Sequence, residues 1–124
     1  MEPALMLRAS ATLFAIAALG GLAMAVIRFS AERNPPSWLA MLHGLLAAAG
    51  LTLLAYAWCT TPIPAFASIA LLLFLIAAAG GALLNLGYQL KNVVLPKWLV
   101  VVHAVIAVVG FVLLAIAAWG HAAG

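Results

Sequence analysis

Four apolar stretches, separated by short polar connections, dominate this sequence. They run from Leu5 to Ile27, from Pro36 to Trp58, from Pro64 to Tyr88 and from Pro96 to Trp119. At about 1.5 Å per helical residue, each is long enough to cross a hydrocarbon core of about 30 Å. Short connections force successive helices to run antiparallel. The sequence therefore predicts an all-α membrane protein, a four-transmembrane-helix bundle that forms a single membrane domain over residues 1–124.

The composition agrees with a chain embedded in the lipid bilayer. Apolar residues make up 69% of the 124 residues and charged residues only 6%, whereas a soluble domain usually carries about a quarter charged residues. The net charge of +3 comes from very few side chains. No cluster of Lys and Arg can neutralise several phosphates, so nucleic acid is not an expected partner. Cys59 is the only cysteine, which excludes an intrachain disulfide and a CxxC motif.

The two halves of the chain align when one is shifted by sixty residues without a gap. The shift brings together residue types that rarely match by chance: Gly20–Gly21 with Gly80–Gly81, Pro36 with Pro96, Trp38 with Trp98, and His43 with His103. We interpret this pattern as a tandem duplication of a two-helix hairpin, with repeat one over residues 5–58 and repeat two over residues 64–119. Each repeat crosses the membrane twice, so an approximate two-fold axis along the membrane normal should relate the two.

The basic residues predict the orientation in the membrane. Arg28, Arg33, Lys91 and Lys97 lie in or beside the first and third connections and are opposed only by Glu32. The positive-inside rule places these connections in the cytoplasm. Both termini are then expected on the periplasmic side, most simply in a bacterial inner membrane.

Proline residues mark the expected helix starts. Pro35 or Pro36 and Pro96 suit the first turn of a helix, where no N–H group is needed. Asn34 is a candidate N-cap for the second helix.

Two histidines lie at matching depth inside the second and fourth apolar stretches. His43 and His103 each follow a proline by seven residues, about 10 Å below the cytoplasmic boundary. An ionisable residue inside a membrane helix indicates function, because an unpartnered polar group in hydrocarbon costs several kcal/mol. Both helices read H-x-x-x-A-x-x-G, which places small residues on the face of each imidazole. These small residues are Ala47, Gly50, Ala107 and Gly110.

This layout fits a flat macrocycle, a haem, placed between the second and fourth helices. His43 and His103 would each supply an axial nitrogen to the iron, and the small residues would leave room for the porphyrin faces. The pairs Gly20–Gly21 and Gly80–Gly81 would let the other two helices close around the ring edges. The haem propionates would reach the cytoplasmic interface, where Arg28, Arg33, Lys91 and Lys97 can serve as counter-ions. Asn85 is expected either to bond across helices or to approach the propionates.

The paired histidines on two helices of a small bundle, with glycines near the ring, resemble the bis-histidine membrane b-type cytochromes. Many members of that class carry four histidines for two haems, whereas this chain has one usable pair, so the resemblance implies at most a single b-type haem. Six-coordinate iron lacks an open site for a substrate, which favours an electron carrier over an enzyme. The expected setting is a free cytochrome or a small subunit of a larger membrane complex, with a quinone or a redox protein as its partner.

Two other functions remain open. A small transporter or proton-relay bundle could use the histidine pair near neutral pH, although the spans contain no Asp or Glu. A haem-free structural or assembly subunit would use the small residues for helix packing alone. A zinc site is less favoured, because no Asp, Glu or Cys lies at the depth of the histidines to complete its ligands. His121 has no counterpart in the other half and is expected to be exposed to solvent.

Overall fold

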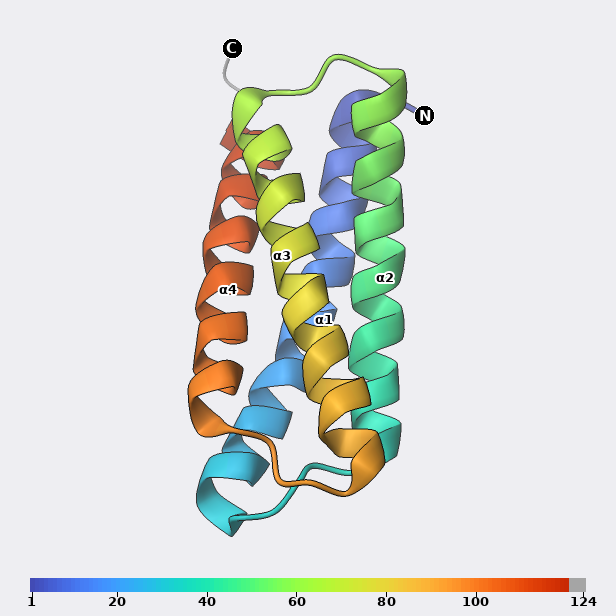
Figure 1. The fold of residues 1–124 in the computed structure, drawn as a ribbon. Coiled ribbons are helices and arrows are strands. Elements are labelled where there is room, and N and C mark those ends of the chain that lie inside the picture. The colour runs from blue at the N-terminus through green and yellow to red at the C-terminus, as the bar shows by residue number, and fades with distance from the viewer. Residues whose placement is uncertain (121–124) are drawn as a thin grey trace.

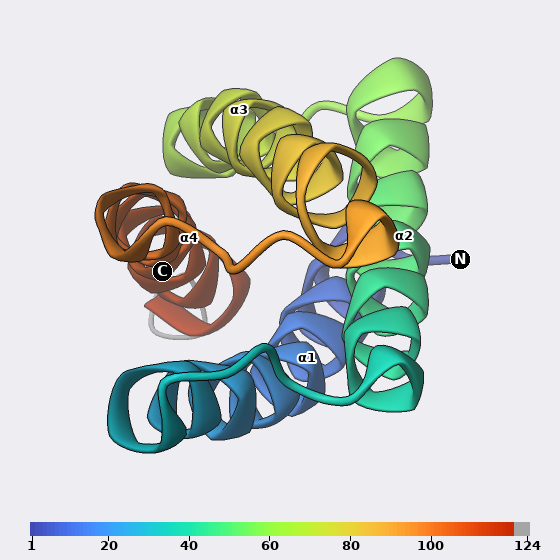
Figure 2. The same cartoon turned by 60° about the horizontal axis from the view of Figure 1, so that its bottom comes forward.

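The computed structural model describes residues 1–120, so His121 lies outside the described residues. The chain forms four long helices, α1 (Pro3–Ala31), α2 (Ser37–Thr60), α3 (Ala65–Gly87) and α4 (Lys97–Trp119), and a short 3-10 helix, η1 (Gln89–Lys91). Residues 1–120 contain no strand. The helices follow one another around the bundle, and α4 returns to pack against α1 (Figures 1 and 2). The predicted all-α four-helix bundle is confirmed, and α2 and α4 lie diagonally across it.

All four long helices are long and apolar enough to cross a membrane. Their outer surfaces carry exposed large apolar side chains along most of their length, among them Leu19, Leu45, Leu72 and Val105. This surface is compatible with an integral membrane protein, because apolar side chains are solvated favourably by lipid chains and unfavourably by water.

The first helix is longer than the sequence suggested. It begins at Pro3 and continues through Arg28 to Ala31, so part of the predicted polar connection is helical. The helix ends at Glu32, whose φ of 53° is left-handed, a common way for a helix to stop. Asn92, sixty residues later, ends η1 in the same conformation with a φ of 56°.

Prolines occupy the N-cap positions of the other three long helices. Pro36, Pro64 and Pro96 stand immediately before the first residues of α2, α3 and α4, so the predicted place in the first turn is wrong by one residue. The carbonyl of Pro36 accepts the first N–H groups of α2, from Leu39 and Ala40.

The prediction that Asn34 caps α2 is wrong. Its side-chain oxygen accepts the N–H of Leu95 at 2.9 Å, and its amide donates to the carbonyl of Val93 at 2.8 Å. Asn34 stands two residues before the N-cap Pro36, so it bonds to the opposite connection rather than to the helix.

The connections 32–36 and 88–96 meet at one end of the bundle, which we call the loop end (Figure 1). Gln89 Nε2 donates to the carbonyl of Pro35 at 2.8 Å, and Arg28 Nε donates to the carbonyl of Leu95 at 2.8 Å. These bonds join residues more than fifty positions apart in the sequence. They fasten the two helical hairpins to each other and close the loop end.

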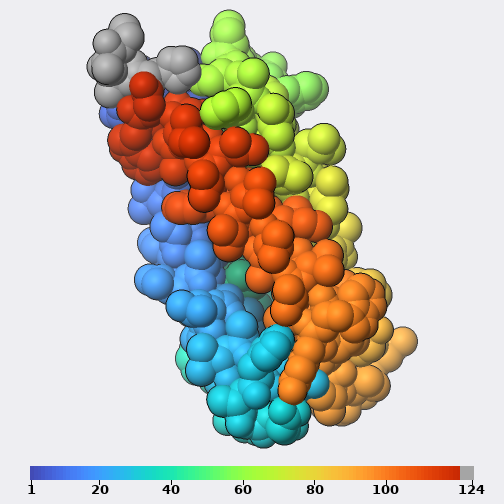
Figure 3. Space-filling model, turned by 90° about the vertical axis from the view of Figure 1, so that its left-hand side faces the viewer, coloured from blue at the N-terminus to red at the C-terminus, as the bar shows by residue number. Residues whose placement is uncertain are grey.

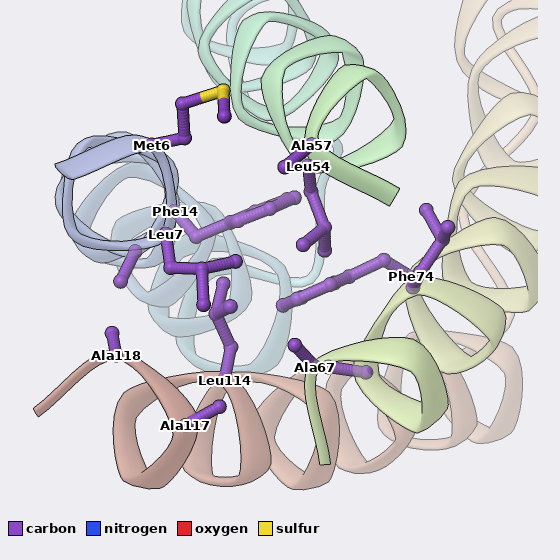
Figure 4. Close-up of a cluster of buried hydrophobic side chains, with 13 residues drawn as sticks. Met6, Leu7, Phe14, Leu54, Ala57, Ala67, Phe74, Leu114, Ala117 and Ala118 are labelled. Atoms are coloured by element: carbon purple, nitrogen blue, oxygen red, sulfur yellow. The ribbon is translucent and has the colours of Figure 1, made fainter. Parts of the chain in front are cut away.

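The apolar core lies toward the other end, where α1 begins and α4 ends, which we call the terminal end (Figure 4). Phe14 of α1 stacks on Phe74 of α3 at its inner limit, with ring centroids 3.8 Å apart and planes 3° from parallel. Nearby, the buried Ser10 hydroxyl donates to the carbonyl of Gly50 at 2.8 Å. This half of the bundle holds the main cluster of buried side chains.

The half between the phenylalanine pair and the loop end buries far fewer residues. No residue is buried in the stretches 18–27, 40–49, 78–87 and 100–109, one from each long helix. Buried residues return only near the loop end, with Arg28, Pro35, Leu39, Gln89, Leu95 and Leu99. Figure 3 shows the surface hollowed between α1 and α4, with α2 visible at the bottom of the opening. We call this region the open half.

Candidate functional site

The open half contains the two histidines of the apolar helices α2 and α4. His43 of α2 and His103 of α4 are half-buried, and their rings face each other across the bundle. The ring centroids are 6.2 Å apart, and the ring planes make an angle of 73°. The diagonal helices thus bring together the two side chains that the sequence singled out.

Each imidazole is held by a backbone carbonyl of the helix that precedes its own in the chain. His43 Nδ1 lies 2.7 Å from the carbonyl oxygen of Ala17 on α1, and His103 Nδ1 lies 2.8 Å from that of Ala77 on α3. A carbonyl oxygen only accepts, so Nδ1 carries the proton and donates it. Nε2 of the neutral ring then keeps its lone pair, which is the form in which histidine binds a metal.

The glycine pairs lie against these rings. A Cβ atom added at Gly21 would lie 3.0 Å from His43 Cε1, and one added at Gly81 would lie 3.1 Å from His103 Cε1. Added Cβ atoms at Gly20 and Gly80 would lie 3.7 Å from the nearest histidine atoms. In this structure the glycines of α1 and α3 therefore leave room for the imidazole rings, whereas the sequence suggested that they border a porphyrin edge.

The small residues of α2 and α4 divide into two groups. An added Cβ at Gly50 would lie 3.0 Å from Phe14, and one at Gly110 would lie 3.4 Å from Phe74. These two glycines thus accommodate the stacked phenyl rings. Ala47 and Ala107, one turn nearer the histidines, are partly buried. A planar guest beside the imidazoles would therefore lie on the loop side of the phenylalanine pair.

Glu32 organises the basic residues at the loop end. Its carboxylate lies 2.7 Å from Lys97 Nζ and 3.4 Å from Arg28 Nη1. The hydrogen bond and the charge of Lys97 lower the pKa of Glu32 from its ordinary value, with a smaller effect from Arg28. Lys91 and Arg33 are exposed and form no ion pair within residues 1–120. The sequence placed four basic residues in or beside these connections but did not indicate that Glu32 binds two of them.

Several residues around the site were not predicted as part of it. Phe14 and Phe74, which bound it on one side, and Ala17 and Ala77, whose carbonyls hold the imidazoles, were outside the predicted set. The sixty-residue offset was the available signal, because it aligns each member of these pairs with the other.

The donor set and spacing fit a haem iron. Two metal–nitrogen bonds of about 2.0 Å, together with the sizes of the two rings, would hold the centroids roughly 6 Å apart, close to the 6.2 Å observed. Among the described residues, no group of three or more His, Cys, Asp and Glu side chains could hold a metal ion. Two imidazoles suffice for a metal whose macrocycle supplies the remaining ligands. Residues 1–120 therefore fit a haem better than a bare zinc ion.

The chain matches no protein-family model, no curated protein and no solved structure.

Proposed function

We propose that this protein is an integral membrane electron carrier that binds one b-type haem between α2 and α4, with His43 and His103 as axial ligands. The observation that supports it best is the opposed imidazole pair. Both rings are hydrogen-bonded through Nδ1, with centroids 6.2 Å apart. They lie in the open half, within the stretches 40–49 of α2 and 100–109 of α4, in which no residue is buried.

The residues of the chain have distinct tasks in this proposal. The bound haem would supply an iron that changes reversibly by one electron. The carbonyls of Ala17 and Ala77 fix the tautomer and orientation of the imidazoles, so that each Nε2 is presented toward the metal. The stacked Phe14 and Phe74 rings separate the site from the terminal end. Two histidines that both bound the iron would leave it no position for a substrate, which favours electron transfer over catalysis.

The basic residues at the loop end would balance the charge of the haem propionates. Lys91 and Arg33 are the most available, because they are exposed and form no ion pair within the part of the chain described here. Arg28 and Lys97 already share Glu32, so their charge is partly neutralised. Lys91 is therefore a better counter-ion for a propionate than Arg28 in this proposal.

We further propose that the two halves arose by tandem duplication. Contacts at positions sixty residues apart support it: His43 bonds to Ala17 as His103 bonds to Ala77. The left-handed residues Glu32 and Asn92 show the same offset. With the basic loop end in the cytoplasm, both termini would lie on the periplasmic side of a bacterial inner membrane. A quinone or a redox protein, in a larger complex or alone, would be the electron partner.

One observation favours a second candidate function, that of a haem-free structural or assembly subunit. Each imidazole already has a hydrogen-bond partner, and the two glycine pairs, together with Gly50 and Gly110, already lie against imidazole or phenyl rings. In a haem-free subunit, the two histidines would only hold the helices together. A proton relay would use the same two rings, but the four spans contain no Asp or Glu to extend it.

The experiment that separates these functions is a haem assay on the purified protein. The protein should be produced with a haem precursor supplied, and its haem measured as the pyridine haemochrome. We expect about one b-type haem per chain, absent in His43→Ala and in His103→Ala. Leu45→Ala and Val105→Ala, two residues further along the same helices and exposed, should retain the haem. A folded, colourless wild-type protein would contradict the proposal and favour the haem-free alternatives.

A further inference from the structure

Asn85 of α3 lies on the face of the helix that borders the open half. The partly buried positions of this stretch are Gly80, Gly81, Leu84, Asn85, Gly87 and Tyr88, whereas Ala82, Leu83 and Leu86 are exposed. The added Cβ at Gly81 points at the ring of His103, 3.1 Å from Cε1. Asn85 follows Gly81 by four residues and therefore shares its face. The amide lies about 6 Å closer to the loop end than Gly81 does.

The side-chain amide of Asn85 stands without a hydrogen-bond partner among the described residues. Asn34 and Gln89, two other side-chain amides near the loop end, bond to backbone groups of the opposite connections. The side chain of Asn85 forms no hydrogen bond with any residue from 1 to 120 and is not fully enclosed. An amide at this depth in an apolar helix is expected to bind something.

The position is also asymmetric between the halves. The residue sixty positions before Asn85 is Ala25, which has no polar side-chain atom. The amide is thus an exception to the offset that relates the two histidines, the two glycine pairs and the two phenylalanines. Helix packing does not require the amide, because Ala25 is accommodated at the equivalent position.

We infer that the side-chain amide of Asn85 binds a carboxylate of the haem, as a donor from Nδ2 on one side of the ring. This inference rests on the proposed haem site. The amide lies between His103 and the basic loop end, the direction in which the propionates would meet Lys91 and Arg33. An N–H donor to a carboxylate forms a charge-assisted hydrogen bond, stronger than a neutral one. Because α1 offers only Ala25 at the equivalent place, the two propionates are held unequally.

The test compares Asn85→Ala with wild type in haem retention and in reduction potential. Alanine is the residue at the equivalent position in the first half, so the variant should fold. We expect haem to pass to excess apomyoglobin about tenfold faster from the variant, the effect of losing one hydrogen bond to a charged group. Its reduction potential should fall, because less of the propionate charge is compensated. Asn85→Gln, which keeps an amide, should recover part of both effects.

Haem dimethyl ester provides the decisive control. Loaded into protein from haem-deficient cells, it lacks the ionised carboxylates, so wild type and Asn85→Ala should release it at similar rates. Equal release of ordinary haem by both proteins would overturn the role of Asn85 while leaving the haem site intact. An equally large effect with the ester would also overturn it, because packing would then explain the loss. A wild-type protein without haem would overturn the haem site, and the inference with it.

Discussion

At the scale of single residues, the imidazoles are held from two directions. A backbone carbonyl of the neighbouring helix accepts the hydrogen bond from Nδ1 of each ring. A glycine of that neighbouring helix leaves space for Cε1. Both constraints act on His43 from α1 and on His103 from α3. Rings held at both points lose little rotational freedom when Nε2 binds a ligand, which strengthens binding.

Gly21→Ala tests this arrangement. The new methyl group would lie 3.0 Å from His43 Cε1, so the ring must shift and weaken its bond to Ala17. We expect a loss of haem content and of stability, the latter by about 1–3 kcal/mol, the usual cost of overpacking. The haem assay and unfolding in mixed detergent micelles would measure the two effects.

Gly44→Ala is the matched control. Its added Cβ would meet nothing within 4 Å, and alanine in a helix interior is favoured over glycine by about 0.5–1 kcal/mol. This variant should keep the haem and be slightly more stable. Equal behaviour of the two variants would show that Gly21 does not position the ring.

The sequence predicted the histidine pair but not what holds it. The offset and the matching depth pointed to His43 and His103 because histidine is rare in such a chain. The carbonyls of Ala17 and Ala77 gave no signal, since every residue has a carbonyl and only the packing of helices decides which one is near. Asn34 was misassigned for a similar reason: a capping residue and a residue that bonds to a distant connection look alike in sequence.

At the scale of helices, the stacked Phe14 and Phe74 rings are the boundary between two kinds of packing. On the terminal side, buried apolar side chains fill the bundle, and on the loop side, none of the four stretches described above does so. The rings approach each other because Gly50 and Gly110 lack side chains there. The stack therefore determines how far the tight core extends.

A double-mutant cycle with Phe14→Leu and Phe74→Leu measures the stack. We expect each single variant to be destabilised and the two to be coupled by about 0.5–1.5 kcal/mol, the value of a favourable aromatic pair. Phe66→Leu, on the exposed face of α3, should change stability by less than about 0.5 kcal/mol. Additive effects of the two core variants would contradict a stabilising stack.

Helix number and approximate span were predictable because about twenty apolar residues in a row have few other uses. The ends were less predictable. The segment from Arg28 to Ala31 belonged to a predicted connection, yet it is helical, and the Arg28 side chain bonds to the carbonyl of Leu95 and to Glu32. The uneven burial along the bundle was not predictable from the sequence. A row of alanines and glycines on one helix face has the same sequence pattern whether aromatic rings fill the space beside it or the space stays open.

At the scale of the whole molecule, the loop end joins the two hairpins through hydrogen bonds and one shared carboxylate. Glu32 lies beside Lys97 of the other hairpin and Arg28 of its own. Its pKa is lowered from 4.5, first by the hydrogen bond and charge of Lys97. Because the pKa of Glu32 is lower in the folded protein than in the unfolded chain, its ion pairs stabilise the fold at pH values above the pKa of the unfolded chain. This stabilisation is lost as the pH falls through the pKa of the folded protein.

Acid should therefore weaken the loop end through Glu32. We expect the unfolding free energy to decrease below pH 4.5, the ordinary value for this group, and the decrease to be smaller in Glu32→Gln, which cannot ionise. Because Glu32 is exposed, high salt should reduce the difference. Detergent unfolding measured against pH would show this. Glu2→Gln, at the terminal end, should keep the wild-type slope, and an unchanged slope in Glu32→Gln would contradict the role of Glu32.

The electron paramagnetic resonance spectrum of the oxidised protein is the most direct measurement of the haem site. The account predicts a low-spin ferric signal from two axial imidazoles. Its shape should be strongly anisotropic, because the planes of His43 and His103 are 73° apart. The signal should be lost when either histidine is replaced by alanine. A high-spin signal from the wild-type protein, or a haem signal that survives both replacements, would contradict the account.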